Sequence, residues 1–539
     1  MRTLAVLIFG SMLLAAISAP AEKPALVVFI SVDQLRGDMP HTYHDRFVEG
    51  GLRRFFDEGA VYSNAHFGHT TTYTASGHAT LATGGNPREH GLVGNSWIDP
   101  ATGKTVYCVQ DTGHTLLGKR STRESAGTSP KNLLVETIGD VLIDATEGRA
   151  RVFSVSRKDR SAILMGGHKG KAFWYDGETG GIVTSTYYYD KYPKWVAKWN
   201  DAKHADRYKG AVWDLLRDRS SYIYRDQDER EVELTHPQLG ETFPHSLEGL
   251  EGRELYSTLT VMPFADELTA DFAKEIMLNE KLGQSGVTDM LMLGLSATDG
   301  IGHVFGPYSL EAEDNILRLD ALLADFFAFL DEQVGLDKTI LVLSSDHGVD
   351  GNPPGQWMGQ LNPVTAVETA RAALKARYGD DREYVHRLVS PYIYFTPALL
   401  KERAGDIAEM EDHAAEALLD VDGVAYAIPR HKILAGDLDD SPLMQRVARS
   451  FHPELSGNVF VIPHKFYRIY TTLRYTATHG TPYDYDTHVP VMFAGPGVSN
   501  VETGREVGPE SIAATLAALL DIDPPAGATG PVLKEVIGE

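Results

Sequence analysis

The chain has 539 residues, of which 43% are hydrophobic, and a formal charge of −24 at pH 7. This length and composition permit a large core, arranged as one big domain with insertions or as several smaller domains. The negative charge argues against a broad surface for nucleic acid or anionic membranes, because such surfaces need clustered Lys and Arg. A small anionic substrate is still allowed if metals or a few basic residues supply local positive charge.

The first 21 residues read as an export signal. Arg2 precedes an apolar run over residues 4–17, and the Ala-Pro-Ala of residues 19–21 is typical of a cleavage site. That run is shorter than the roughly 20 residues that span a membrane, and no later stretch is long enough. We therefore expect a periplasmic or secreted bacterial protein with no membrane span in its mature form. Cys108 is the only cysteine, so no intramolecular disulfide can form.

Three apolar runs predict strands that are buried on both faces. They cover residues 25–33, 290–299 and 339–346, and each closes on an aspartate. Because ligands in open α/β sheets gather beyond the carboxyl ends of the strands, these aspartates are expected to meet in space. The three closing residues are Asp33, Asp299 and Asp346.

Helical patterns separate these strands, one beginning near residue 266 and one over about 310–331. An order of strand, helix and strand implies parallel pairing. A late strand from Pro490 and a closing helix over about 509–520 extend the core to the end of the chain. The predicted fold class is α/β, with a central, mostly parallel sheet flanked by helices.

Two stretches of different composition interrupt this pattern. Residues of about 161–255 are rich in Tyr, Trp, Lys, Asp and Arg, and about 351–455 mixes acidic helical segments with short strands. We interpret both as cap insertions in one catalytic domain over residues 22–539. No internal repeat or low-complexity tract is found.

The acidic residues at the predicted strand ends have histidines beside them. Asp346-His347-Gly348 follows one strand, Asp299 and His303 lie four residues apart, and His479-Gly480 precedes the late strand. A lone Asp-His pair is more often a turn or a salt bridge, but the repeated pairs favour a metal site, because clustered carboxylates repel one another without a cation. Oxygen and imidazole ligands suit zinc, with manganese or iron as alternatives. The candidate ligands are Asp33, Asp299, His303, Asp346, His347 and His479.

A hydroxyl-rich segment over residues 70–84 runs into a short helical pattern and places Thr74 near a helix N-terminus. Backbone N–H groups and the helix dipole favour anions there. A bound metal can lower the pKa of a hydroxyl enough to make it a nucleophile. The plain alternative, which local sequence alone favours, is that these hydroxyls only cap the helix.

Lys158 and Arg160 follow a probable strand that starts at residue 151. Their i, i+2 spacing aims both cations at one face if the extended backbone continues. A lysine and an arginine together suit a dianionic phosphate monoester, although Lys-Asp-Arg alone is an ordinary solvated charge run. Asn95 could donate its amide to the same phosphate, but Gly-Asn sequences are more often turns.

Taken together, these motifs resemble the alkaline phosphatase superfamily, and most closely its bacterial threonine-nucleophile branch, the PafA-like phosphomonoesterases. The match runs from Asp33 to the final helix. The resemblance implies two Zn²⁺ per chain and a covalent phosphothreonine intermediate. It assigns two groups of metal ligands: Asp33, Asp346, His347 and Thr74 for one zinc, and Asp299, His303 and His479 for the other. It assigns Asn95, Lys158 and Arg160 to the phosphate pocket.

The resemblance favours small phosphate monoesters as substrates, because related phosphodiesterases lack the Lys-x-Arg pair. A phosphodiesterase or nucleotide pyrophosphatase on the same metals stays the first alternative, and a non-catalytic phosphate- or metal-binding protein the second. A sulfatase is a poor interpretation, since no Cys/Ser-x-Pro-x-Arg motif surrounds Thr74. His488 competes with His479 as the last ligand, His78 is interpreted as structural, and His69 is left unassigned. A monomer is favoured, with the oligomeric state open.

Overall fold

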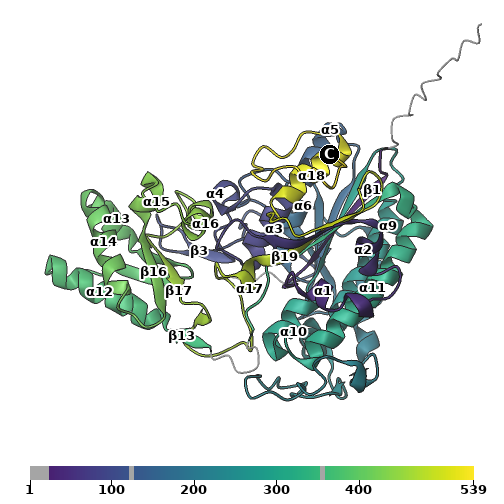
Figure 1. Cartoon of the computed structure of the whole chain (residues 1–539), viewed down its shortest axis with the longest axis horizontal. Helices are drawn as coiled ribbons and strands as arrows, with labels where there is room; N and C mark the ends of the chain where they lie inside the picture. Colours follow the sequence, from purple (N-terminus) through teal and green to yellow (C-terminus); the bar gives the residue numbers. More distant parts are fainter. Residues whose placement is uncertain (1–22, 120–126, 352–357) are drawn as a thin grey trace, which may run out of the picture.

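The computed structural model describes residues 23–119, 127–351 and 358–539, so the predicted export signal at 1–21 lies outside the described residues. Its centre is a ten-stranded sheet in the order β20-β2-β19-β12-β1-β11-β6-β7-β8-β5 (Figure 1). The strands from β12 to β7 pair in parallel, whereas β19 and β8 pair antiparallel to their neighbours. The strands are β1 (Leu26–Val32), β2 (Ala60–His66), β5 (Leu116–Leu117), β6 (Val152–Ser156), β7 (Lys171–Tyr175), β8 (Ile182–Ser185), β11 (Asp289–Leu295), β12 (Thr339–Ser344), β19 (His488–Ala494) and β20 (Val501–Thr503).

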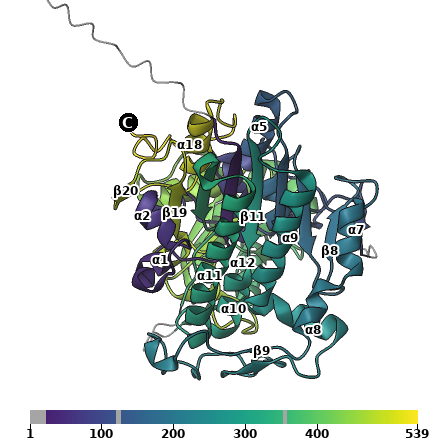
Figure 2. The ribbon, with the colours of Figure 1, turned by 90° about the vertical axis from the view of Figure 1, so that its right-hand side faces the viewer.

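Strand β1 shows why a continuous apolar run suits the middle of this sheet. Its residues point alternately to the two faces. Val28 and Ile30 pack in one core with α9 (Phe264–Glu280) and α11 (Leu310–Gln333), which lie in front of β11 in Figure 2. Val27 and Phe29 pack in a second core on the other face. That core includes residues of α3 (Thr74–Thr83), α5 (Ile138–Ala145) and α18 (Ser511–Leu520). The predicted α/β fold class is confirmed.

The two expected cap segments differ in structure. The first contributes β7 and β8 to the central sheet before it continues as loops and short helices. The second builds a lobe of its own, seen beside the main body in Figure 1. A four-stranded sheet of this lobe packs against α12 (Pro363–Tyr378) and α14 (Ile407–Leu418). Its strands are β14 (Val385–Val389), β15 (Tyr392–Phe395), β17 (Val459–Pro463) and β16 (Val424–Pro429). The exact limits of the insertions stay a prediction. Among the described residues, no helix is long and apolar enough to cross a membrane.

A loop of the first cap segment places a buried carboxylate, Glu233, near the first turn of α11. The Glu233 side chain is 1% exposed, and neither of its carboxylate oxygens makes a hydrogen bond to a described residue. Burial and the nearby Glu311 carboxylate raise the pKa of Glu233 to about 9, against the opposing effect of Arg230, whose Nε lies 4.0 Å from Glu233 Oε1. The net shift favours the protonated carboxyl at neutral pH.

Glu233→Gln is expected to stabilise the protein at pH 8 by about 1 kcal/mol and to raise Tm there. The unfolded glutamate loses its proton near pH 4.3, so the wild-type free energy of unfolding falls as pH rises from there to about 9. Glutamine keeps the shape and has no proton to lose. Thermal melts at several pH values should show a Tm gain that vanishes near pH 4. The exposed Glu231→Gln is the matched control, and a gain independent of pH would contradict the assignment.

Candidate metal centre and nucleophile

Asp33 and Asp346 lie at the carboxyl ends of two neighbouring parallel strands. β1 pairs with β12 from Leu26↔Thr339 to Ser31↔Ser344, so the residues that follow both strands emerge at one edge of the sheet. His347 Nε2 lies 3.6 Å from Asp33 Oδ1 and 3.3 Å from Asp346 Oδ2. All three side chains are completely buried. The expected meeting of these two strand ends is confirmed.

Asp299 differs from the prediction that placed it at a strand end. β11 ends at Leu295, and Asp299 lies in the first turn of α10 (Ala297–Phe305). The helix makes Asp299 and His303 neighbours on one face, since residues four apart face the same way. His303 Nε2 lies 3.2 Å from Asp299 Oδ1. The helix thus carries this Asp-His pair to the edge of the sheet where Asp33 lies.

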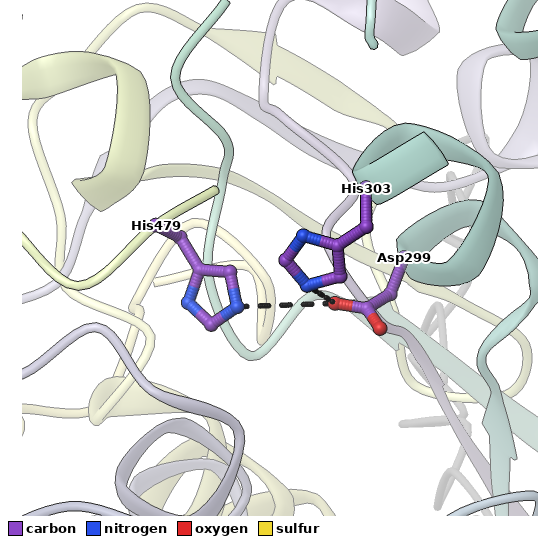
Figure 3. A group of neighbouring side chains, drawn as sticks. All are labelled: Asp299, His303 and His479. Atoms are coloured by element: carbon purple, nitrogen blue, oxygen red, sulfur yellow. Dashed lines mark ion pairs between the residues drawn. The ribbon is translucent and has the colours of Figure 1, made fainter. Parts of the chain in front are cut away.

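His479 completes this group, as Figure 3 shows. Its Nε2 lies 3.8 Å from Asp299 Oδ1, and the ligand atoms of Asp299, His303 and His479 all lie within 4.8 Å of one another. His488 lies elsewhere: its ring stacks on His66 and its Nε2 contacts Ser63 O at 2.9 Å. The geometry therefore favours His479 over His488 as the last ligand.

A second candidate group consists of Asp33, Asp299 and His347, so Asp299 belongs to both. Asp33 Oδ1 and His347 Nε2 are buried and make no hydrogen bond to any described residue. Burial and the nearby Asp299 and Asp346 carboxylates raise the pKa of Asp33 to about 7. Such a set of carboxylate oxygens is costly to bury without a cation. The site therefore has the composition and the unpaired ligand atoms of a centre for divalent cations.

The three histidines present the same ring nitrogen to this centre. Nδ1 of each donates to a backbone carbonyl, because a carbonyl can only accept. The carbonyls are Ala477 O for His303, Gly348 O for His347 and Thr72 O for His479, at 2.7–2.9 Å. In a neutral ring this leaves the Nε2 lone pair for a metal. Burial lowers the pKa of His347 to about 4 and that of His479 well below its usual range, so both rings stay in the neutral, metal-binding form.

Thr74 begins α3 beside this centre. The preceding Tyr73 is extended, and Asn95 Oδ1 accepts the N–H of Ala75 at 2.9 Å, which fixes the helix N-terminus. Gly77 allows the helix to approach the sheet, because a Cβ there would lie 1.9 Å from Asp346 O. The expectation that Thr74 lies at a helix N-terminus is confirmed. Its hydroxyl is not a cap, since the N-cap position belongs to Tyr73.

Lys158 and Arg160 both reach Thr74, but not by the expected backbone. β6 ends at Ser156, and Lys158 is the N-cap of α6 (Asp159–Gly166), so Arg160 lies in the first turn of a helix rather than on a continued strand. Lys158 Nζ and Arg160 Nη2 lie 3.5 Å and 3.4 Å from Thr74 Oγ1. Lys158 Nζ also lies 2.5 Å from Asp33 Oδ2 and 2.7 Å from Asp299 Oδ2. The lysine therefore pairs with Asp33 and Asp299, the two carboxylates of the candidate groups.

Sequence reasoning missed two side chains at this centre, Gln34 and Arg157, and interpreted a third, His78, as structural. Gln34 donates from Nε2 to Asp299 Oδ1 at 3.2 Å, and Arg157 Nη2 lies 3.5 Å from Asp299 Oδ2. His78 Nδ1 lies 3.2 Å from Asp346 Oδ2. The only sequence feature that could have pointed to these side chains is their closeness in the chain to a predicted site residue. His69, which had no assignment, contacts Thr80 Oγ1 at 3.2 Å in a buried cluster.

Known proteins identify the family of this chain. A family model described as type I phosphodiesterase / nucleotide pyrophosphatase matches residues 27–488. The chain belongs to this family.

Within the family, several relatives align along nearly the whole chain. Alkaline phosphatase PhoV of Synechococcus elongatus is 34% identical over 96% of this chain and 93% of its own length. A Myroides odoratus protein named calcium-transporting ATPase is 36% identical over 96% of both chains. The crystal structure of alkaline phosphatase PafA superimposes with a TM-score of 0.88 at 32% identity and covers 96% of this chain and 100% of that one. The resemblance stated from the motifs is confirmed.

Removing divalent metal is expected to lower stability as well as activity. A ligand present at 100 times its Kd stabilises the folded state by about 2.7 kcal/mol. Zinc added back to chelator-treated protein should therefore raise Tm, measured by a thermal melt. His479→Ala should reduce this rise, whereas His488→Ala should keep it because His488 lies outside both candidate groups. An equal rise in both variants would contradict the choice of His479.

Proposed function

We propose that the protein is a zinc-dependent alkaline phosphatase that hydrolyses phosphate monoesters with Thr74 as its nucleophile. The observation that carries this proposal is the position of Thr74 Oγ1 at the N-terminus of α3, within 3.5 Å of Lys158 Nζ and 3.4 Å of Arg160 Nη2. The same lysine contacts both candidate metal groups. A hydroxyl, two cations and two metal groups thus converge on one point, as recognition of a phosphate requires.

Zinc suits the ligands better than a harder cation, because imidazole nitrogens are half of the set. Asp33, Asp346 and His347, together with Thr74, would hold one zinc. Asp299, His303 and His479 would hold the other. The bound metals lower the pKa of a hydroxyl and neutralise phosphate charge.

The reaction then has two displacements at phosphorus. The Thr74 hydroxyl gives up its proton and its oxygen forms a bond to phosphorus as the ester P–O bond breaks, and the alcohol leaves with the electron pair and takes up one proton, so that the proton count is unchanged. The phosphothreonine is cleaved when a water oxygen attacks phosphorus, which releases inorganic phosphate and returns the Thr74 hydroxyl. Lys158, Arg160 and the Asn95 amide would bind the non-bridging oxygens. Lys158 becomes available for this once its two carboxylates are bound to cations.

The relatives support this chemistry. Two are named alkaline phosphatases. A second PafA structure carries substitutions at a threonine, an asparagine, a lysine and an arginine. Thr74, Asn95, Lys158 and Arg160 are the same residue types in the same order, and in both chains the first two lie 21 positions apart and the last two lie two apart. The name of the Myroides odoratus relative implies cleavage of a phosphoanhydride. This is also a phosphoryl transfer, so the name does not distinguish a phosphomonoesterase from a phosphodiesterase or nucleotide pyrophosphatase.

We propose in addition that the protein is exported to the periplasm or secreted, with residues 1–21 as a cleaved signal peptide. The residues from 22 to the C-terminus would then form one catalytic domain with two cap insertions. Its partners are small phosphorylated molecules rather than nucleic acid, in keeping with the charge of −24. A monomer is the favoured oligomeric state.

The test is to load the mature protein with zinc and to compare turnover of an aryl phosphate monoester with that of its diester analogue. A strong monoester preference supports the proposal. Diester preference would favour a phosphodiesterase or nucleotide pyrophosphatase on the same metals. Zinc binding without turnover of either compound would favour a non-catalytic binding protein.

A further inference from the structure

Helix α10 carries two of the proposed metal ligands, and its N-terminus is capped by another helix. Its own N-cap residue, Ser296, makes no side-chain capping hydrogen bond. Instead Asp266, in the first turn of α9, accepts the N–H groups of Ser296 and Ala297 on Oδ1, at 2.8 Å and 3.0 Å. Asp266 is 2% exposed, and its Oδ2 has no hydrogen bond to a described residue. The Asp266 carboxyl thus occupies the positive end of this helix, where a negative charge is favoured.

Arg157 contacts the same turn from the end of β6. Its Nη2 lies 3.3 Å from Ser296 O and 3.5 Å from Asp299 Oδ2. It is also close enough to Asp266 to oppose the effect of burial, which raises the pKa of that carboxyl to about 7. The arginine therefore contacts the carboxylate that would bind metal and acts electrostatically on the carboxyl that caps α10.

The other end of α10 is fixed to the segment that carries His479. Thr476 donates its backbone N–H to His303 O at 2.8 Å, and His303 Nδ1 donates to Ala477 O at 2.7 Å. The group of Asp299, His303 and His479 therefore combines ligands from two segments. A shift of the first turn of α10 would move Asp299 relative to His479 and change the distance between their ligand atoms.

We propose that Asp266 and Arg157 are positioning residues that set the metal affinity of the site formed by Asp299, His303 and His479. This inference rests on the proposed function, because it takes that site to hold zinc. Outer partners that orient metal ligands typically change metal affinity by 10- to 100-fold when they are lost. An ordinary helix cap would instead change only the stability of the fold.

Asp266→Asn tests this directly at pH 8, above the Asp266 pKa of about 7, because the amide oxygen can still accept the two N–H groups while the charge is lost. Zinc affinity is measured on metal-free protein by competition with a chelator of known affinity. We expect wild type to bind two zinc ions and the variant to bind one of them about 10- to 100-fold more weakly. Excess zinc should restore kcat. Arg157→Ala should show the same loss, and Arg157→Lys should recover part of it.

Asp271→Asn, on the same helix α9 and paired with Arg207 at 2.6 Å, is the matched control and should bind zinc as wild type does. Unchanged zinc affinity in Asp266→Asn and Arg157→Ala, with a lower Tm of the metal-free protein, would overturn the inference and leave only a helix cap. Wild-type protein that binds no zinc would overturn the proposed function as well. The two failures are thus distinguishable.

Discussion

Replacing Thr74 with alanine is expected to lower kcat for an aryl phosphate monoester by roughly 10⁴-fold or more. The alanine has no oxygen to bond to phosphorus, so the covalent route is lost, while the aspartate and histidine ligands and the Lys158–Arg160 pair stay in place. Among the described residues, the Thr74 hydroxyl accepts only two long hydrogen bonds, from Lys158 Nζ at 3.5 Å and Arg160 Nη2 at 3.4 Å, and the N-terminus of α3 is fixed independently by Asn95. Folding should therefore match wild type. Because Thr74 is one of the four proposed ligands of its zinc, kcat is compared at saturating zinc, where Asp33, Asp346 and His347 keep that site occupied.

Thr74→Ser is the matched variant, because it keeps the oxygen and removes only a methyl group. We expect it to retain substantial turnover and to form a phosphoserine. Acid quenching of the reaction with labelled substrate, followed by peptide mapping, should find phosphate on residue 74 in wild type and in Thr74→Ser. A Thr74→Ala protein that still turns over at a comparable rate would mean that water attacks the substrate directly.

The centre of the fold could be predicted because its strands are buried on both faces. β1 and β12 read as continuous apolar runs that end in a carboxylate, and both were placed correctly. Parallel pairing then brings the residues after them together, so Asp33, Asp346 and His347 follow from sequence and elementary sheet geometry. Thr74 was located for a similar reason, since a hydroxyl-rich turn before a helical pattern marks a helix N-terminus.

The rest of the site depends on contacts between segments far apart in the chain. Asp299 was expected to end a strand, but the chain forms a helix two residues after Leu295, and the N–H groups of this helix are bound by Asp266 from α9. No local sequence pattern predicts that Asp266 would bind the N–H groups of this helix. The same holds for Gln34, which carries a positive φ of 70° and donates its backbone N–H to Asp346 Oδ1, 312 residues away.

Replacing Arg160 with alanine is expected to change substrate preference as well as rate. We expect kcat/KM for a phosphate monoester to fall roughly 100- to 1,000-fold, the effect typical of losing one preorganised donor to a developing charge. The loss for a diester should be about tenfold or less, because a diester has one negative charge fewer for the guanidinium to bind. The ratio of the two kcat/KM values, measured on zinc-loaded enzyme, reports this difference.

Arg149→Ala, an exposed arginine whose Nε donates to Thr146 O, is the control and should leave both values unchanged. Equal losses for monoester and diester in Arg160→Ala would show that the arginine orients Thr74 rather than recognising the second phosphate charge. The distances allow that reading, since Arg160 Nη2 lies 3.4 Å from Thr74 Oγ1. Recognition of the dianion requires the two losses to differ, because only the charge of the substrate distinguishes the two compounds at this position.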